Sequence, residues 1–242
     1  STLTRSSAAS DVYKRQDNVI YEFERIDFTR VFDLTTNTVI VSLIASLIIV
    51  TIAVYFQFLK RIIRNKTIML FNEVISLTYA LPGAVIGLAL IIMLTSPPLK
   101  SEILIGSFSV LIYAYVMRYM AVGISPLKSS FEKHPSSFDD TALNLGMSPV
   151  KLFRRIHLPI NMSAIAIAFL ITFVDIIKEL PITLILRPFN FDTLAVQTFQ
   201  YAVDEMIPKS AIYSLTIVLV GTILLIFLKK IVNKQINVFK NN

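Results

Sequence analysis

The sequence of 242 residues contains no cysteine and no tryptophan, and only 16% of its residues are charged. Without cysteine, the chain can form neither a disulfide framework nor a thiolate metal site. The 55% share of hydrophobic residues and a mean hydropathy of +0.68 exclude an ordinary soluble domain. The composition therefore predicts an all-α polytopic membrane protein.

Enzymatic signatures are also missing. The sequence has no Gly-rich motif of the kind that cradles nucleotide phosphates, so we expect no ATP hydrolysis by this chain alone. No catalytic constellation stands out either. The net charge of +7 is compatible with nucleic-acid binding, but the positive residues follow membrane topology instead, so no nucleic-acid partner is expected.

Five apolar segments are long enough to cross a hydrocarbon core of about 30 Å. These predicted spans cover residues 37–59, 74–95, 103–123, 160–186 and 210–228. The segments between them alternate in positive charge: 13 Lys and Arg fall in 60–71, 124–160 and 229–242, against five in 17–36, 96–102 and 187–209. By the positive-inside rule, the first set is cytoplasmic, and so is the C-terminus.

The N-terminal region is expected to lie outside the apolar core. Residues 1–16 are polar and lack the apolar run of a signal peptide, so they are interpreted as a non-native extension or a disordered tail. Residues 17–36 are acidic, with apolar side chains at near-helical spacing, which predicts a short periplasmic surface helix. Five spans with a cytoplasmic C-terminus leave this segment outside, so we expect a further helix upstream of the given sequence.

The polar interruption at residues 138–159 predicts two short helices joined at Gly146. Glycine suits the position just after a helix end, where φ is often positive. Ser148 followed by Pro149 is typical of a helix start, and Pro159 is expected to end the second helix. The predicted docking face of this elbow is apolar and consists of Leu145, Met147, Val150, Leu152, Phe153 and Ile156. The basic residues beside it are Lys151, Arg154 and Arg155.

This stretch resembles the EAA loop of binding-protein-dependent ABC transporter permeases, whose pattern is E-A-A-x3-G-x9-I-x-L-P. The positions that match in identity and spacing are Ala142, Gly146, Ile156, Leu158 and Pro159. Asp140 replaces the usual Glu, and Thr141 replaces the first Ala. His157 occupies a free position of the pattern and receives no role. The alternative is an ordinary amphipathic loop lying on the bilayer surface.

The resemblance implies a six-helix type I importer core, of which five helices are visible in residues 37–242. It also implies that the loop at 124–159 docks on a cytoplasmic ABC ATPase dimer. ATP and Mg would be bound by that partner, and no cofactor by this chain. The other implied partners are a periplasmic substrate-binding protein, a second permease half and the lipid bilayer of the bacterial inner membrane.

The second and third predicted spans each carry a feature of note, and Pro82 of the second is assigned to the translocation path or its gate. Pro82, in the stretch 79–83, removes a helix hydrogen bond, so a kink or break is expected there. Broken membrane helices line cavities or pack on neighbours. In the next span, Arg118 is expected to extend toward the cytoplasmic interface.

Three charges follow fifteen uncharged residues in the fourth predicted span: Asp175, Lys178 and Glu179. Their spacing predicts that all three share one helix face, which ends at Pro181. Charges at this depth are costly unless they are paired or face water. They are interpreted either as a polar lining or gate of the translocation path, or as an ion-paired structural cluster near the outer interface.

Residues 178–195 resemble a segment typical of iron(III) permeases of the ABC importer class, and residues 79–83 resemble the same subfamily. The likeness runs from residue 37 to the C-terminus and is greatest to the C-terminal half of permeases with two fused halves. It implies import of ferric iron by alternating access. Permeases for thiamine, sulfate or polyamine share the scaffold. An ion-driven secondary transporter, with Asp175 and Glu179 as a proton relay, is the alternative of another class.

Oxygen ligands suited to Fe(III) occur in the predicted outer loop, at Asp192, Tyr201, Asp204 and Glu205. They show no recognised ligand spacing. We therefore predict that they contact the binding protein or cap the loop, and we predict no metal site.

Overall fold

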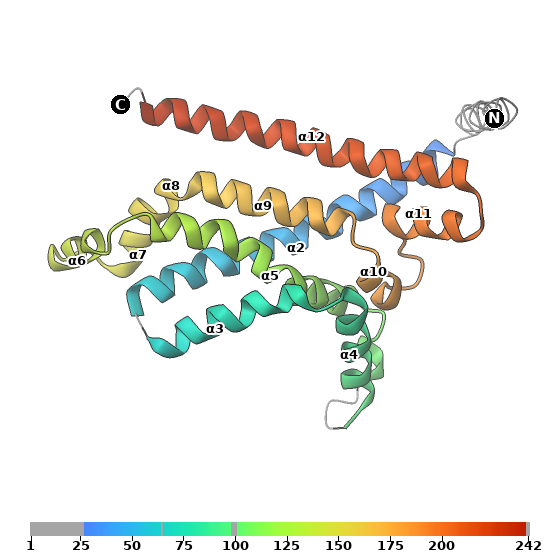
Figure 1. Cartoon of the computed structure of the whole chain (residues 1–242), viewed down its shortest axis with the longest axis horizontal. Helices are drawn as coiled ribbons and strands as arrows, with labels where there is room; N and C mark the ends of the chain where they lie inside the picture. Colours follow the sequence, from blue (N-terminus) through green and yellow to red (C-terminus); the bar gives the residue numbers. More distant parts are fainter. Residues whose placement is uncertain (1–26, 64, 98–100, 241–242) are drawn as a thin grey trace, which may run out of the picture.

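The structure is a computed structural model that describes residues 27–63, 65–97 and 101–240. In these residues it contains helices and connecting turns but no β-strand, as the sequence predicts. Four long helices lie side by side: α2 (Phe28–Ile63), α5 (Phe108–Glu132), α9 (Met162–Ile177) and α12 (Ile207–Lys240) (Figure 1). They form the body of the molecule.

Of the shorter helices, α3 (Lys66–Leu77) runs along the body and α4 (Gly83–Thr95) projects from it, while the others lie at its two ends (Figure 1). At one end lie α6 (Ser137–Asn144), α7 (Pro149–Leu152), the π-helical turn Phe153–His157 and α8 (Leu158–Ile160). The opposite end carries α10 (Pro181–Leu186) and α11 (Leu194–Val203). The C-terminal end of α12 lies at the same end as α6 and α7 (Figure 1).

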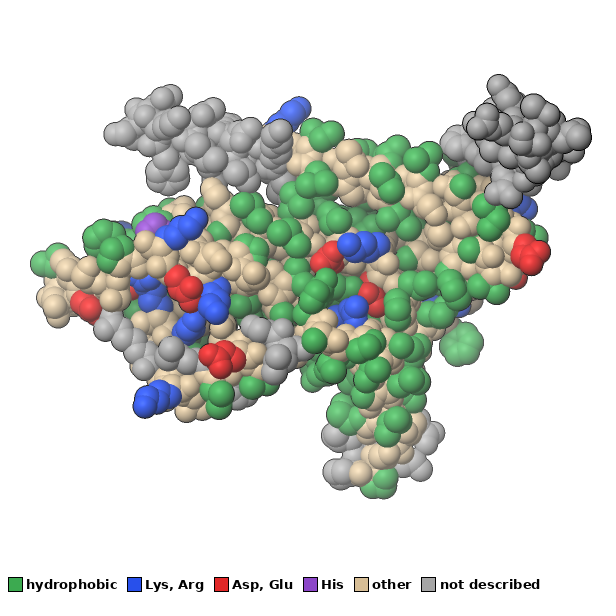
Figure 2. All heavy atoms as spheres, viewed as in Figure 1, with side chains coloured by type: hydrophobic (Ala, Val, Ile, Leu, Met, Phe, Trp, Pro, Cys, Tyr) green, Lys and Arg blue, Asp and Glu red, His purple; other side chains and the backbone are tan. Residues whose placement is uncertain are grey.

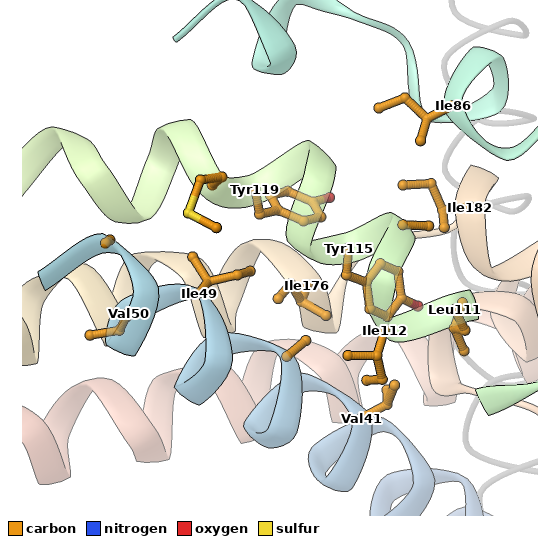
Figure 3. Close-up of a cluster of buried hydrophobic side chains, with 14 of the residues drawn as sticks. Val41, Ile49, Val50, Ile86, Leu111, Ile112, Tyr115, Tyr119, Ile176 and Ile182 are labelled. Carbon is orange, nitrogen blue, oxygen red and sulfur yellow. The ribbon is translucent and has the colours of Figure 1, made fainter. Parts of the chain in front are cut away.

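The main core lies where α2, α5 and α9 meet. Small side chains such as Ala45, Ala114 and Ala168 are fully buried there, and they allow the helix backbones to approach closely. Larger apolar side chains fill the remaining space, among them Ile49 and Tyr115 (Figure 3). Many apolar side chains also cover the outer surface, including that of α12 (Figure 2). A surface of this kind suits contact with lipid.

Three helices of the described chain are long and apolar enough to cross a membrane: Phe28–Ile63, Phe108–Glu132 and Ile207–Phe227. Two bent helix pairs raise the number to five if each pair is one span. The first pair joins Lys66–Ala80 to Gly83–Thr95 at 107°, and the second joins Pro149–Ile160 to Met162–Ile177 at 71°. The break predicted at Pro82 is therefore present.

Several predicted boundaries are wrong. Residues 28–36 form the first turns of α2 instead of a separate surface helix, while residues 1–26 lie outside the described part. The third span begins at Phe108, not at 103, because Ser107 caps α5, which then runs on to Glu132. This shortens the loop predicted to begin at residue 124.

The fourth predicted span, 160–186, is also divided. Helix α9 ends at Ile177, and α10 starts at Pro181 as a separate helix. Proline has no backbone N–H and fits the first position of a helix. At the other end, Pro159 does not stop the preceding helix, which continues through Ile160 to a break at Asn161.

Candidate functional site

The elbow between α6 and α7 has the geometry that its sequence predicts. Gly146 has a φ of +80°, a conformation that favours glycine. Ser148 precedes α7, and its hydroxyl accepts a hydrogen bond from the Lys151 N–H at 3.4 Å. The two short helices are therefore held at a fixed angle by local chemistry.

The predicted docking face is divided between the interior and the surface. Leu152 is fully buried, and Met147, Phe153 and Ile156 pack beside it in a small core with Phe58, Phe131 and Ala142. Leu145 and Val150 are instead 83% and 63% exposed. We define the coupling surface as the exposed side chains of this region: Phe138, Leu145, Val150, Lys151, Arg154 and Arg155.

The residues of the EAA-like pattern are divided in the same way. Ala142 is buried, whereas Ile156 and Leu158 are half-buried and hold the loop to the body. The exposed positions of the pattern are Asp140, Thr141, Gly146 and Pro159.

A buried polar cluster that the sequence did not predict lies beneath the coupling surface. It consists of Arg61, Asp139 and His157, and we call it the loop joint. The Asp139 carboxylate accepts hydrogen bonds from the Arg61 Nε and lies 2.8 Å from the His157 Nε2. Asp139 and His157 are 2% and 4% exposed. His157, to which the sequence analysis gave no role, therefore makes a buried contact. The buried acid is Asp139, whereas its neighbour Asp140 is exposed.

A sequence signal for this cluster exists in retrospect. His157 lies four residues after Phe153, so both fall on one helix face, and Phe153 belongs to the buried side of the loop. The ring of His157 stacks on Phe131 with centroids 5.4 Å apart.

The second polar centre lies inside the body, where the two helix breaks meet. The break at Pro82 leaves the Leu81 carbonyl outside a helix, and Arg118 Nη1 donates to that oxygen at 2.8 Å. Arg118 Nε lies 3.6 Å from Glu179 Oε2. The prediction that Arg118 extends to an interface is wrong: the residue sits near the middle of α5, and its side chain is only 19% exposed.

Glu179 occupies the other side of this centre and is 6% exposed. Its carboxylate accepts from the Tyr119 hydroxyl and, at 3.1 Å, from the Ile182 N–H. The Ile182 N–H belongs to the first turn of α10, where the helix dipole also stabilises a negative charge. We call the group formed by Arg118, Tyr119, Glu179 and the Leu81 carbonyl the outer contact.

The outer contact is packed tightly against α4 (Gly83–Thr95). A Cβ placed on Gly83 would lie 2.7 Å from Glu179 Oε1 and 3.0 Å from Arg118 Nη1. One turn further, a Cβ on Gly87 would lie 3.3 Å from the Cβ of Ile185 on α10. Figure 3 shows Ile86 and Ile182 between these two helices, with Tyr115 and Tyr119 on the neighbouring α5. Only glycine fits at position 83 without displacement of the charged pair.

The predicted single face of Asp175, Lys178 and Glu179 is wrong. Helix α9 ends before Lys178, so Glu179 turns toward α5, while Asp175 pairs with Lys178 at 2.8 Å. Asp175 lines a cavity of about 500 Å³ together with the polar side chains of Tyr79, Ser125 and Lys128. Pro82 lies at the break and is exposed; the Leu81 carbonyl, not the proline ring, makes the polar contact.

The outer loop makes contacts that its sequence did not specify. Asp192 pairs with Arg187 and, at 3.4 Å, with Arg30 on α2. Tyr201 stacks on Tyr213 with ring centroids 5.4 Å apart, and Glu205 is in the left-handed region. Among the residues that the structure describes, no three His, Asp or Glu side chains are grouped as metal ligands.

Comparison with known proteins agrees with this architecture. The family model described as the binding-protein-dependent transport system inner membrane component matches residues 50–237. The Fe(3+)-transport system permease protein FbpB 2 of Haemophilus influenzae is 28% identical over 204 residues, which make up 84% of this chain and 40% of that protein. The maltose/maltodextrin transport system permease proteins MalG of Photorhabdus laumondii and Escherichia coli are 34% and 35% identical over 91 residues, 37% of this chain and 30% of theirs.

The chain thus spans less than half the length of these curated relatives. The family model, by contrast, covers most of the chain, including α5, the elbow, α9 and nearly all of α12. The chain belongs to the family of binding-protein-dependent transport system inner membrane components.

Proposed function

We propose that this chain is the membrane-spanning unit of an ATP-driven importer that brings ferric iron from a periplasmic binding protein into the cytoplasm. The observation that carries the proposal is the match to an Fe(3+)-transport permease over 84% of the chain, within a family match at residues 50–237. The maltose permeases match over only 37% of the chain, so iron is favoured over a sugar. Thiamine, sulfate and polyamine are the alternative substrates of the same scaffold.

The coupling surface is proposed to face the cytoplasm and to dock on a separate ABC ATPase dimer, which binds ATP and Mg. Its exposed apolar side chains, among them Leu145 and Val150, would enter a cleft on the ATPase, with Lys151 and Arg154 beside them. The C-terminal end of α12 lies at the same end of the molecule, so the C-terminus would be cytoplasmic too (Figure 1). A second permease unit would complete the path, and we propose that it is fused upstream.

The cavity and the outer contact support a path with one open and one closed side. The cavity is lined by Tyr79, by six α5 residues between Ala121 and Lys128, and by Ile171 and Asp175 of α9. The α5 and α9 residues precede Glu179 or follow Arg118 in their segments and so lie on the loop side of the outer contact. The outer contact closes the opposite side. This arrangement corresponds to an inward-open state, and transport would require α4 and the Leu81 carbonyl to separate from Glu179 and α10.

The ion-driven alternative finds less support in the same contacts. Asp175 binds Lys178, whereas Glu179 binds Tyr119 and the α10 backbone. The two carboxylates therefore face different partners, whereas a proton relay needs them to exchange protons with each other.

The test is uptake of labelled Fe(III) by a strain without its own iron permease, carrying the full-length gene with its cognate binding protein and ATPase. We expect ATP-dependent uptake in the parent and loss of uptake in Gly146→Pro, because proline cannot adopt the positive φ at the elbow. Excess thiamine, sulfate or polyamine should not compete. Absence of iron uptake while the ATPase still co-purifies would remove iron as the substrate and keep the ABC permease assignment.

A further inference from the structure

The loop joint connects four parts of the chain that are distant in sequence. Arg61 lies in the last turn of α2, Asp139 in the first turn of α6, and His157 at the end of the π-helical turn. Phe131, on which the His157 ring stacks, lies in the last turn of α5. The inner ends of α2 and α5 and both arms of the elbow therefore meet at one point.

Arg61 uses all three of its guanidinium nitrogens in this position. Nε binds Asp139, Nη1 donates to the Phe131 and His134 carbonyls at 2.5 and 2.9 Å, and Nη2 donates to the Pro135 carbonyl at 2.8 Å. The carbonyls at the end of a helix have no partner within it. One side chain of α2 thus caps the end of α5 and fixes the start of α6.

The π-helical turn explains how His157 reaches Asp139. A π-turn inserts an extra residue into a helix and redirects the side chains that follow. Here the Leu158 N–H binds the Phe153 carbonyl, five residues back, and His157 faces inward between Phe131 and Phe58. The Asn161 amide then donates to the His157 carbonyl at 2.8 Å, immediately before α9 begins.

The two charged residues of the outer contact belong to segments that leave the joint, Arg118 near the middle of α5 and Glu179 just after α9. Arg118 and Tyr119 are on α5, about 18 Å from Phe131 at 1.5 Å per residue. Glu179 directly follows α9, which starts just after Asn161. A displacement of the joint can therefore be carried along α5 and α9 to the two sides of the outer contact.

We propose that Arg61, Asp139 and His157 are positioning residues that join the coupling loop rigidly to α2 and α5, so that a movement imposed on the coupling surface reaches the outer contact. The inference rests on the proposed function, in which an ATPase moves that surface. Without the joint, the elbow is attached to the body only by apolar packing. The loop can then rotate against the body, so that only part of the movement of the coupling surface reaches the outer contact.

The first test measures iron uptake per ATP hydrolysed by the complete transporter in liposomes. His157→Phe keeps a ring for stacking on Phe131 but removes the donor to Asp139, whereas His157→Gln keeps an amide donor. We expect uptake per ATP to fall about tenfold in the first variant and less than about threefold in the second, with ATPase association preserved in both. Equal uptake per ATP in His157→Phe and the parent would overturn the proposal.

The second test does not depend on the substrate. These 242 residues contain no cysteine. Once any cysteine elsewhere in the transporter has been replaced, spin labels can be placed specifically at Asn144→Cys at the end of α6 and Ile52→Cys on α2, both exposed positions. In the assembled transporter we expect one narrow distance distribution that ATP leaves unchanged, and a broad one after Asp139→Asn. A distribution that ATP shifts in the parent, or that Asp139→Asn leaves narrow, would contradict a rigid joint even if the transported substrate is not iron.

Discussion

The loop joint and the outer contact are built from the same kinds of groups but reveal themselves differently in the sequence. Each holds one arginine and one carboxylate, both largely buried. At the joint, the recognisable motif includes neighbouring exposed residues such as Asp140 and Gly146, while the buried Asp139 and His157 are not among its defining positions. At the outer contact, the charges are conspicuous in an apolar segment, but their partners are not. The EAA-like motif therefore identifies a surface that a partner can contact, whereas the charge of Glu179 in an apolar segment identifies a buried ion pair.

The largest effect is expected at the outer contact. Glu179→Ala would leave Arg118 without its ion-pair partner and the Tyr119 hydroxyl without its acceptor in a buried site, at a cost of about 3–5 kcal/mol. We expect a strongly lowered thermal midpoint of the purified transporter and no iron uptake.

Asp175→Asn is the control for that variant. Its partner Lys178 is 63% exposed in its side chain, and an exposed ion pair contributes about 0–1 kcal/mol. Equal destabilisation by Glu179→Ala and Asp175→Asn would show that the burial of Glu179 does not make its contacts more important for stability than those of Asp175.

The two adjacent acids of α6 provide the corresponding comparison at the loop. Asp139→Ala leaves the largely buried Arg61 without its carboxylate partner, so we expect the free energy of unfolding to fall by about 3 kcal/mol. Asp140 is exposed, and a contact of an exposed carboxylate contributes about 0–1 kcal/mol, so Asp140→Ala should change stability by less than about 1 kcal/mol. Its resemblance to the EAA acid predicts instead a weaker affinity for the ATPase, measured by co-purification. The reverse pattern, with Asp140→Ala as the destabilising variant, would refute the assignment of the joint.

Gly83→Val tests how tightly α4 packs on the charged pair. The added side chain must displace Glu179 or Arg118, and overpacking of this kind costs about 1–3 kcal/mol. Gly221→Val on α12 is the matched control, since a Cβ there has no neighbour within 4 Å. Thermal midpoints should fall for the first variant and change little for the second; equal midpoints would mean that α4 is free to move away.

The smallest effect is expected at the elbow glycine. A Cβ on Gly146 meets nothing within 4 Å, so Gly146→Ala introduces only the strain of a positive φ, about 1–2 kcal/mol. Gly146→Asn should cost less, because asparagine tolerates this conformation. We expect a higher thermal midpoint for Gly146→Asn than for Gly146→Ala. The opposite order would mean that the destabilisation does not come from the positive φ of this residue.

Local features of this fold could be predicted from the sequence. The elbow at Gly146, the cap at Ser148 and the break at Pro82 depend on the conformational preferences of those residues and their neighbours. The apolar segments likewise predict helices, although α2 and α5 extend beyond them.

The pairing of charges could not be predicted in the same way. Arg61 and Asp139 are 78 residues apart, and Tyr119 and Glu179 are 60 apart. Helical periodicity assigned Glu179 to the face of Asp175, but that assignment fails because the helix ends at Ile177. Which remote segments meet depends on packing of the whole bundle, and the spacing along one helix contains no information about it.

The central claim, that the path opens where α4 separates from α10, can be tested directly with a disulfide. A Cβ on Gly87 would lie 3.3 Å from the Ile185 Cβ. This is slightly closer than the roughly 3.5–4.5 Å that separates bridged Cβ atoms, so a small shift of α4 allows Gly87→Cys to pair with Ile185→Cys. These 242 residues contain no cysteine; with any cysteine elsewhere in the transporter replaced, we measure iron uptake by the oxidised and the reduced transporter. The account predicts that oxidation stops uptake, that reduction restores it, and that the ATPase stays bound throughout. Undiminished uptake with the disulfide fully formed would contradict it.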